Sequence, residues 1–112
     1  MSSLGYGYEK TFLAVLALAT GTGSLKDRLI DAFESQLNRI FKPVNEIPEE
    51  FKEEILALEA DATARKARTP SEGSIRSTID QMSEKEAKQL AERVLKLFTG
   101  IAHAYHLQKA RL

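Results

Sequence analysis

TFLAVLALA, residues 11–19, is the stretch that decides how this chain folds, because almost every position around a helix of that sequence is apolar. It is cut off by a turn-forming segment, Thr20-Gly-Thr-Gly-Ser24. A helix that is apolar all round must be covered by something. Three coverings are open: the segment is the hydrophobic region of a secretory signal, it lies at the centre of a helical bundle, or it stays exposed until a partner covers it.

The secretory reading has some support in the sequence, since the run has a suitable length and Ala17-Leu18-Ala19 resembles a cleavage tripeptide. Against it, Glu9 cancels the charge of Lys10, and ten residues precede the run. We therefore expect a retained helix and a cytoplasmic protein.

The bulk composition indicates one soluble domain. The chain has 112 residues, 43% of them hydrophobic, and it contains no run of about 18 apolar residues that would span a membrane. Sixteen basic and sixteen acidic residues balance, so the net charge favours neither a DNA-coating protein nor a DNA mimic. Without cysteine there is no disulfide, no thiolate nucleophile and no cysteine-ligated metal.

The first half of the chain predicts two helices. Residues 1–7 are rich in Gly and Ser and are predicted to be a loose lead-in, with the first helix starting near Tyr8 or Glu9 and stopping at Thr20. Ser24 and Asp27 have the spacing of a capping box, which starts an amphipathic helix of about four turns that Pro43 ends.

The second half predicts three more. Pro48 suits the first position of a helix whose acids gather in its first turns and whose last turn holds basic residues. A loop over 69–74 precedes a short helix over 75–82, and a capping box of Ser83 and Glu86 opens a last helix that runs to about Leu107. No segment alternates like a strand. The fold class is therefore all-α, a single-domain bundle of four or five helices over residues 1–112.

The wide apolar faces predict a protein that acts by binding protein, and a homodimer is the oligomer we favour. The expected contact residues lie on the first and last helices: Phe12, Val15, Leu16, Phe98, Ile101 and Tyr105.

Three other kinds of site are weighed against structural explanations. Phosphates of a nucleic acid would be contacted by the only local basic cluster, Arg65, Lys66, Arg68 and Arg76, although dipole complementarity at a helix end explains most of it. A small anion would be held at the second helix start by Thr22, Ser24 and Lys26, but turn and cap account for these residues. A metal would be held by His103 and His106, for which nothing in the sequence supplies a third ligand.

The sequence offers few candidate catalytic residues. Paired carboxylates on a solvated helix face are common, and no serine or threonine has an evident base partner. We expect neither an enzyme nor a cofactor.

The order of several short motifs resembles that of short all-helical bacterial proteins of unknown function. The motifs are Leu18-Ala19-Thr20-Gly21, Asp27-Arg28-Leu29, Gly73-Ser-Ile75 leading through Thr78 to Met82-Ser83, and Glu86-Ala87. The resemblance covers roughly residues 12 to 99. It implies a compact helical protein and assigns no catalytic residue.

Overall fold

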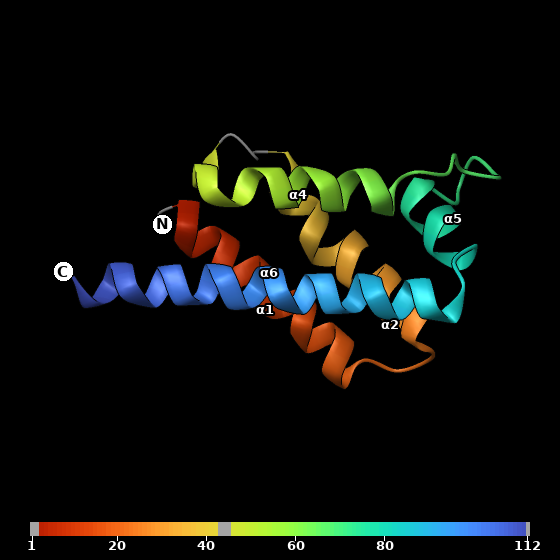
Figure 1. Cartoon of the computed structure of the whole chain (residues 1–112). Coiled ribbons are helices and arrows are strands. Elements are labelled where there is room, and N and C mark those ends of the chain that lie inside the picture. Colours follow the sequence, from red (N-terminus) through yellow and green to blue (C-terminus); the bar gives the residue numbers. More distant parts are fainter. Residues whose placement is uncertain (1–2, 43–45, 112) are drawn as a thin grey trace.

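Helix follows helix throughout the computed structural model, which describes residues 3–42 and 46–111 (Figure 1). The elements are α1 (Ser3–Thr20), α2 (Leu25–Ala32), the π-helical segment η1 (Phe33–Leu37), α3 (Asn38–Phe41), α4 (Glu49–Ala62), α5 (Ser74–Asp80) and α6 (Glu84–Ala110). Since α2, η1 and α3 follow one another without a break, these elements make five helical units. The described ranges contain no strand. The predicted all-α bundle is confirmed.

The long helix α6 runs the length of the molecule, with α1 crossing it and α4 lying alongside (Figure 1). Helix α1 packs on α6 and also on α2 and η1, so three elements cover one side of it. The fully buried large side chains come from every helix after α1: Leu29, Phe33, Leu37, Ile40, Ile55, Leu58, Ile79, Val94 and Ile101. No helix in the described ranges is both long enough and apolar enough to cross a membrane.

Only one side of the apolar run in α1 is covered. Thr11 and Ala14 are completely buried, and the Thr11 hydroxyl donates to the Gly7 carbonyl at 2.8 Å, so its polar group is satisfied. On the other side, Phe12 is 45% and Leu16 43% exposed. The bundle therefore leaves part of this helix in solvent.

The prediction of a loose lead-in at residues 1–7 is wrong, because α1 begins at Ser3. Leu4 is buried, and a Cβ placed on Gly7 would lie 3.6 Å from Ile47 and 3.8 Å from Ile101. These are ordinary van der Waals distances, so this part of α1 packs against the two isoleucines with room for a methyl group at Gly7. Tertiary packing thus overrides the poor helix propensity of the glycines.

The second helical unit follows its prediction at the start. Ser24 and Asp27 form a complete capping box, with both reciprocal hydrogen bonds at 3.1 Å. A π-helical turn at Phe33–Leu37 interrupts the regular geometry, and no local sequence signal announced it. The unit ends at Phe41 with Lys42 as its C-cap. Pro43, predicted to end this helix, lies outside the described residues.

Helix α4 is shorter than predicted. Pro48 is its N-cap rather than its first residue, and it ends at Ala62, so its last turn holds no basic residue. After Ala62 the chain leaves α4, and hydrogen bonds to α5 hold the residues that follow. The Arg65 amide donates to the Thr78 hydroxyl at 2.9 Å, and the Ser77 hydroxyl donates to the Lys66 carbonyl at 2.9 Å. The explanation of the basic cluster by the dipole of this helix is therefore wrong.

Helices α5 and α6 lie close to their predictions. Helix α5 covers Ser74–Asp80, and α6 begins after the Ser83–Glu86 capping box, which is fully formed. Hydrogen bonds from the Ser83 backbone and side chain lower the pKa of Glu86. Helix α6 continues to Ala110, three residues beyond the predicted end.

Candidate protein-interaction face

Helices α1 and α6 together present an apolar surface to solvent. Phe12 and Leu16 of α1 and Leu95 of α6, which is 51% exposed, are its most exposed members. No residue of α1 from Thr11 to Thr20 carries a charge. We name this surface the α1/α6 face and define it by Tyr8, Phe12, Val15, Leu16, Leu95, Phe98 and Tyr105.

Stacked aromatic rings hold the two helices of this face together. The Tyr8 ring lies parallel to Tyr105, with 4.5 Å between centroids and 6° between planes. Tyr8 also stacks on Phe98 at 5.9 Å, and Phe12 contacts Phe98 at 6.2 Å. Such ring pairs contribute about 0.5–1.5 kcal/mol each beyond their buried area. The order of the contacts shows that α1 runs antiparallel to α6.

Five of the six predicted contact residues lie on this face, and one does not. Phe12 and Leu16 are exposed, whereas Val15, Phe98 and Tyr105 are partly buried. Ile101 is completely buried, so its prediction as a contact residue is wrong: the apolar stripe of α6 is wide enough to have a core edge and a surface edge, and Ile101 faces the core. Tyr8, absent from the predicted set, was detectable one helical turn before Phe12.

An apolar groove of about 340 Å³ adjoins the face where α1 and α6 diverge and α2 begins. Two charged side chains, Lys88 and Glu92, stand at its rim. The rest of its lining is aliphatic: Val15, Leu18, Ala19, Leu25, Ala91 and Leu95. The groove is thus suited to an apolar side chain.

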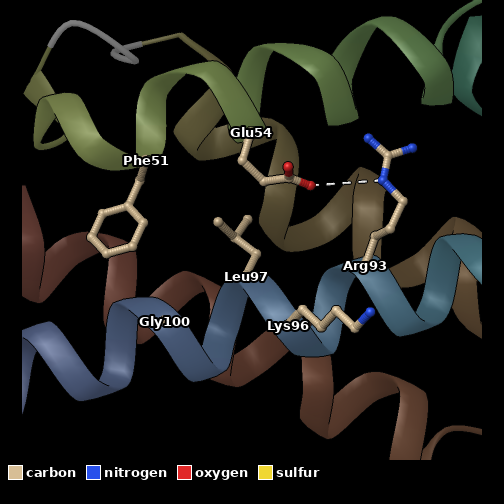
Figure 2. Close-up of a pocket in the computed structure, with 6 residues that line it drawn as sticks. All are labelled: Phe51, Glu54, Arg93, Lys96, Leu97 and Gly100. Carbon is tan, nitrogen blue, oxygen red and sulfur yellow. Dashed lines mark ion pairs between the residues drawn. The ribbon is translucent and has the colours of Figure 1, made fainter.

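A second hollow, of about 240 Å³, lies between α4 and α6 and is shown in Figure 2. Phe51 and Leu97 supply its apolar wall, and Gly100 leaves room for the Phe51 ring. Arg93 pairs with Glu54 at 3.7 Å and with Asp61 at 2.7 Å. These ion pairs tie α4 to α6, which is a structural role.

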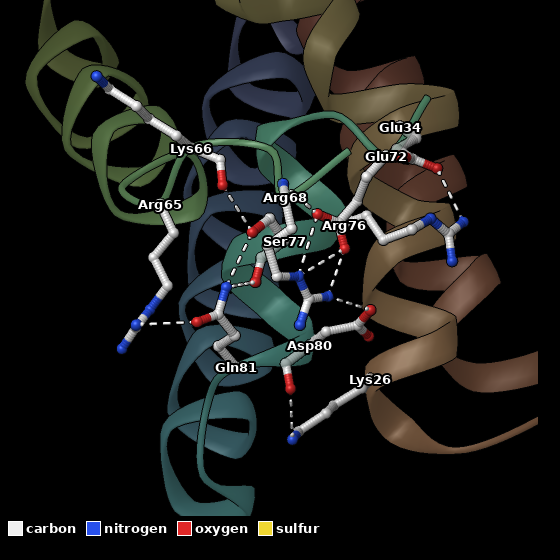
Figure 3. Close-up of polar contacts among 10 residues, drawn as sticks. All are labelled: Lys26, Glu34, Arg65, Lys66, Arg68, Glu72, Arg76, Ser77, Asp80 and Gln81. Carbon is white, nitrogen blue, oxygen red and sulfur yellow. Dashed lines mark hydrogen bonds and ion pairs between the residues drawn. The ribbon is translucent and has the colours of Figure 1, made fainter. Parts of the chain in front are cut away.

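The predicted nucleic-acid contacts engage other side chains of the protein, as Figure 3 shows. Arg68 forms a forked pair with Glu72 and also reaches Asp80 at 3.4 Å. Arg76 pairs with Glu34 at 3.4 Å, and the Arg65 guanidinium donates to the Gln81 side chain at 3.1 Å. Lys66 meets α5 through its backbone carbonyl. The three arginines therefore act as ties between the loop, α5 and η1.

Glu72 is the most strongly perturbed group of this cluster. Hydrogen bonds from the Arg68 side chain and then from its backbone amide lower the pKa of Glu72 to about 2. The same contact raises the pKa of Arg68. The Glu72 carboxylate stays ionised at neutral pH, and its contacts with Arg68 hold the loop between α4 and α5.

At the predicted anion site, the Asp27 carboxylate already lies at the start of α2. The Asp27 carboxylate accepts from the Ser24 amide, while the Ser24 hydroxyl accepts from the Asp27 amide. Lys26 donates to the Asp80 carbonyl at 3.4 Å, and Thr22 is exposed in the turn. A negative ligand would have to compete with the Asp27 carboxylate.

Both histidines lie on the outer side of α6. His103 is exposed, and the His106 ring meets Tyr8 and Tyr105 edge-on at 5.3 and 5.4 Å. Among the described residues, no group of three or more His, Asp or Glu side chains is placed to hold a metal ion.

Comparison with known proteins gives no relative: no family model matches the sequence, and no curated protein or solved structure is significantly similar to it. Its function is therefore inferred from its own surface.

Proposed function

We propose that this protein is a non-catalytic interaction protein that forms a homodimer through the α1/α6 face. The observation that carries the proposal is the exposure of Phe12, Leu16 and Leu95 on one surface, on which α1 carries no charge from Thr11 to Thr20. Clustered apolar side chains of this kind mark interaction sites on soluble proteins. Homodimer interfaces are also more apolar than the general protein surface.

The area of the face sets the expected strength of the dimer. From Tyr8 to Leu16 the helix α1 is about 12 Å long, and two adjacent helices are about 20 Å wide. The face therefore covers about 250 Å² on each copy, or about 500 Å² for the pair. Because stable interfaces bury about 1,000 Å² or more, we expect a weak dimer that forms at high protein concentration.

The titratable groups support a non-catalytic role. Contacts within the protein shift the pKa values of Arg68, Glu72 and Glu86. Each owes its shift mainly to a loop tie or to a helix cap. Glu86 lines a hollow of about 290 Å³, but Arg68 and Glu72 do not, so the three groups do not converge on one cavity as the perturbed groups of an active site would.

We also propose a cytoplasmic location. A leader peptide cleaved after Ala19 would remove Thr11 and Ala14 from the core and Tyr8 from its stack on Tyr105. The apolar run is thus better explained as a permanent part of the domain.

The experiment is a measurement of molar mass by sedimentation equilibrium from micromolar to millimolar concentration. The wild-type chain is expected to approach twice the monomer mass. Leu16→Ser is expected to shift the equilibrium toward monomer, while the control Leu56→Ser, at a leucine of α4 with 48% exposure, leaves it unchanged. A wild-type chain that stays monomeric over the whole range would refute the proposal.

A further inference from the structure

We infer that the two copies pair with their α1 helices antiparallel, so that the Phe12 ring of each copy enters the apolar groove of the other. This arrangement rests on the proposed dimer and specifies its geometry. A two-fold axis demands that a surface complement itself, so every projection needs a matching hollow on the same face. The α1/α6 face has both.

The projection is Phe12, which is large, apolar and 45% exposed. The hollow is the groove of about 340 Å³, which α1 lines with Val15, Leu18 and Ala19. Leu18 and Ala19 lie six and seven residues after Phe12, about 10 Å farther along the helix at 1.5 Å per residue. Projection and hollow therefore lie on one helix with a short offset.

A two-fold axis that lies in the interface plane, perpendicular to α1 and level with the midpoint between them, exchanges the two. The midpoint falls between Val15 and Leu16, and Leu16 is 43% exposed. Each Phe12 then lies over the groove of the other copy, and the two Leu16 side chains meet close to the axis.

One pair of opposite charges at the edge of the face fits this pairing. Glu9 precedes Phe12 by about one helical turn, and its carboxylate is partly exposed and lies 3.5 Å from the Lys10 ammonium of the same chain. Lys88 and Glu92 stand together at the groove, and Lys88 is the one nearer to its end. Because α1 runs antiparallel to α6, Lys88 stands at the end of the groove nearest the C-terminus of α1. The antiparallel arrangement brings Glu9 of each copy to Lys88 of the other, which makes two opposite-charge contacts per dimer.

Cysteine cross-linking tests the position of the axis, and the chain contains no cysteine to interfere. Three single variants, Leu16→Cys, Leu56→Cys and Leu107→Cys, replace leucines of similar exposure on different faces. Under mild oxidation only Leu16→Cys is expected to give a disulfide-linked dimer. A dimer by sedimentation whose Leu16→Cys variant fails to cross-link overturns this geometry and leaves the proposed function standing. A monomer overturns both.

A charge exchange tests the register independently. Glu9→Lys and Lys88→Glu are each expected to weaken dimerisation about tenfold, since each replaces two attractions by two repulsions, and the double variant is expected to restore it. Ala19→Trp, which fills the groove, is expected to weaken the dimer although it adds apolar surface. Tighter association of Ala19→Trp, or no recovery in the double variant, would contradict the arrangement.

Discussion

Replacing Gly7 with alanine is expected to stabilise the protein, because Gly7 lies inside helix α1. The sequence alone places this residue in a loose lead-in, where the substitution would change almost nothing. The structure places it in the second turn of an 18-residue helix. The change in stability that Gly7→Ala causes therefore distinguishes a loose lead-in from a helix at the N-terminal segment.

The size of the effect follows from the backbone and from the surroundings. Glycine inside a helix is less favourable than alanine by about 1 kcal/mol. The new Cβ would lie 3.6 Å from Ile47 and 3.8 Å from Ile101, which are ordinary van der Waals contacts. The methyl group thus adds buried apolar surface without a clash. We expect a gain of about 1 kcal/mol and a rise in the thermal midpoint of about 4 °C.

The free energy of unfolding is measured by urea denaturation and the midpoint by thermal denaturation, both followed by circular dichroism at a single protein concentration, so that self-association stays constant. The control is Gly73→Ala, the same chemical change at a residue with φ of +80° and no atom within 4 Å of the new Cβ. That backbone conformation favours glycine, so the control is expected to lose about 1 kcal/mol or more. A Gly7→Ala variant with an unchanged or lower midpoint would refute a helical segment at Ser3–Gly7.

Three further substitutions test other elements. The lowered pKa of Glu72 contributes stability above its ordinary pKa of 4.5, and this stability is lost as the pH falls toward about 2. Glu72→Gln is therefore expected to lose less stability than the wild type between neutral and acid pH. Thermal midpoints of variant and wild type that fall in parallel over this range would contradict this. Ser83→Ala removes the N-cap of α6 and is expected to cost about 1 kcal/mol in urea denaturation, and an unaltered midpoint would mean that the cap is dispensable. Ile101→Ala is expected to lower the free energy of unfolding by about 2–5 kcal/mol at every protein concentration, because the Ile101 side chain is wholly buried. A variant of normal stability that no longer dimerises would instead show that Ile101 is a contact residue.

Local signals in the sequence were sufficient for much of the fold. The capping boxes at Ser24 and Ser83 were predicted in full, because a cap is a set of hydrogen bonds between residues three apart. The helical period of α6 and of the unit formed by α2, η1 and α3 was equally readable, since it repeats over several turns.

Contacts between distant segments decided the rest. The segment Ser3–Gly7 is held on the bundle by the burial of Leu4, and the chain after Ala62 is held by hydrogen bonds with Ser77 and Thr78. No residue next to these positions encodes either outcome. The apolar groove beside the α1/α6 face is likewise built from three helices and has no signature in any one of them.

The run at residues 11–19 shows the division most clearly. Its sequence determined that the segment is a helix and that it needs covering, since both follow from the kinds of side chain and their spacing. Which side is covered depended on where α2, η1 and α6 packed around it. Those helices bury Thr11 and Ala14 and leave Phe12 and Leu16 in solvent, because helices on one side of a cylinder cannot enclose the other.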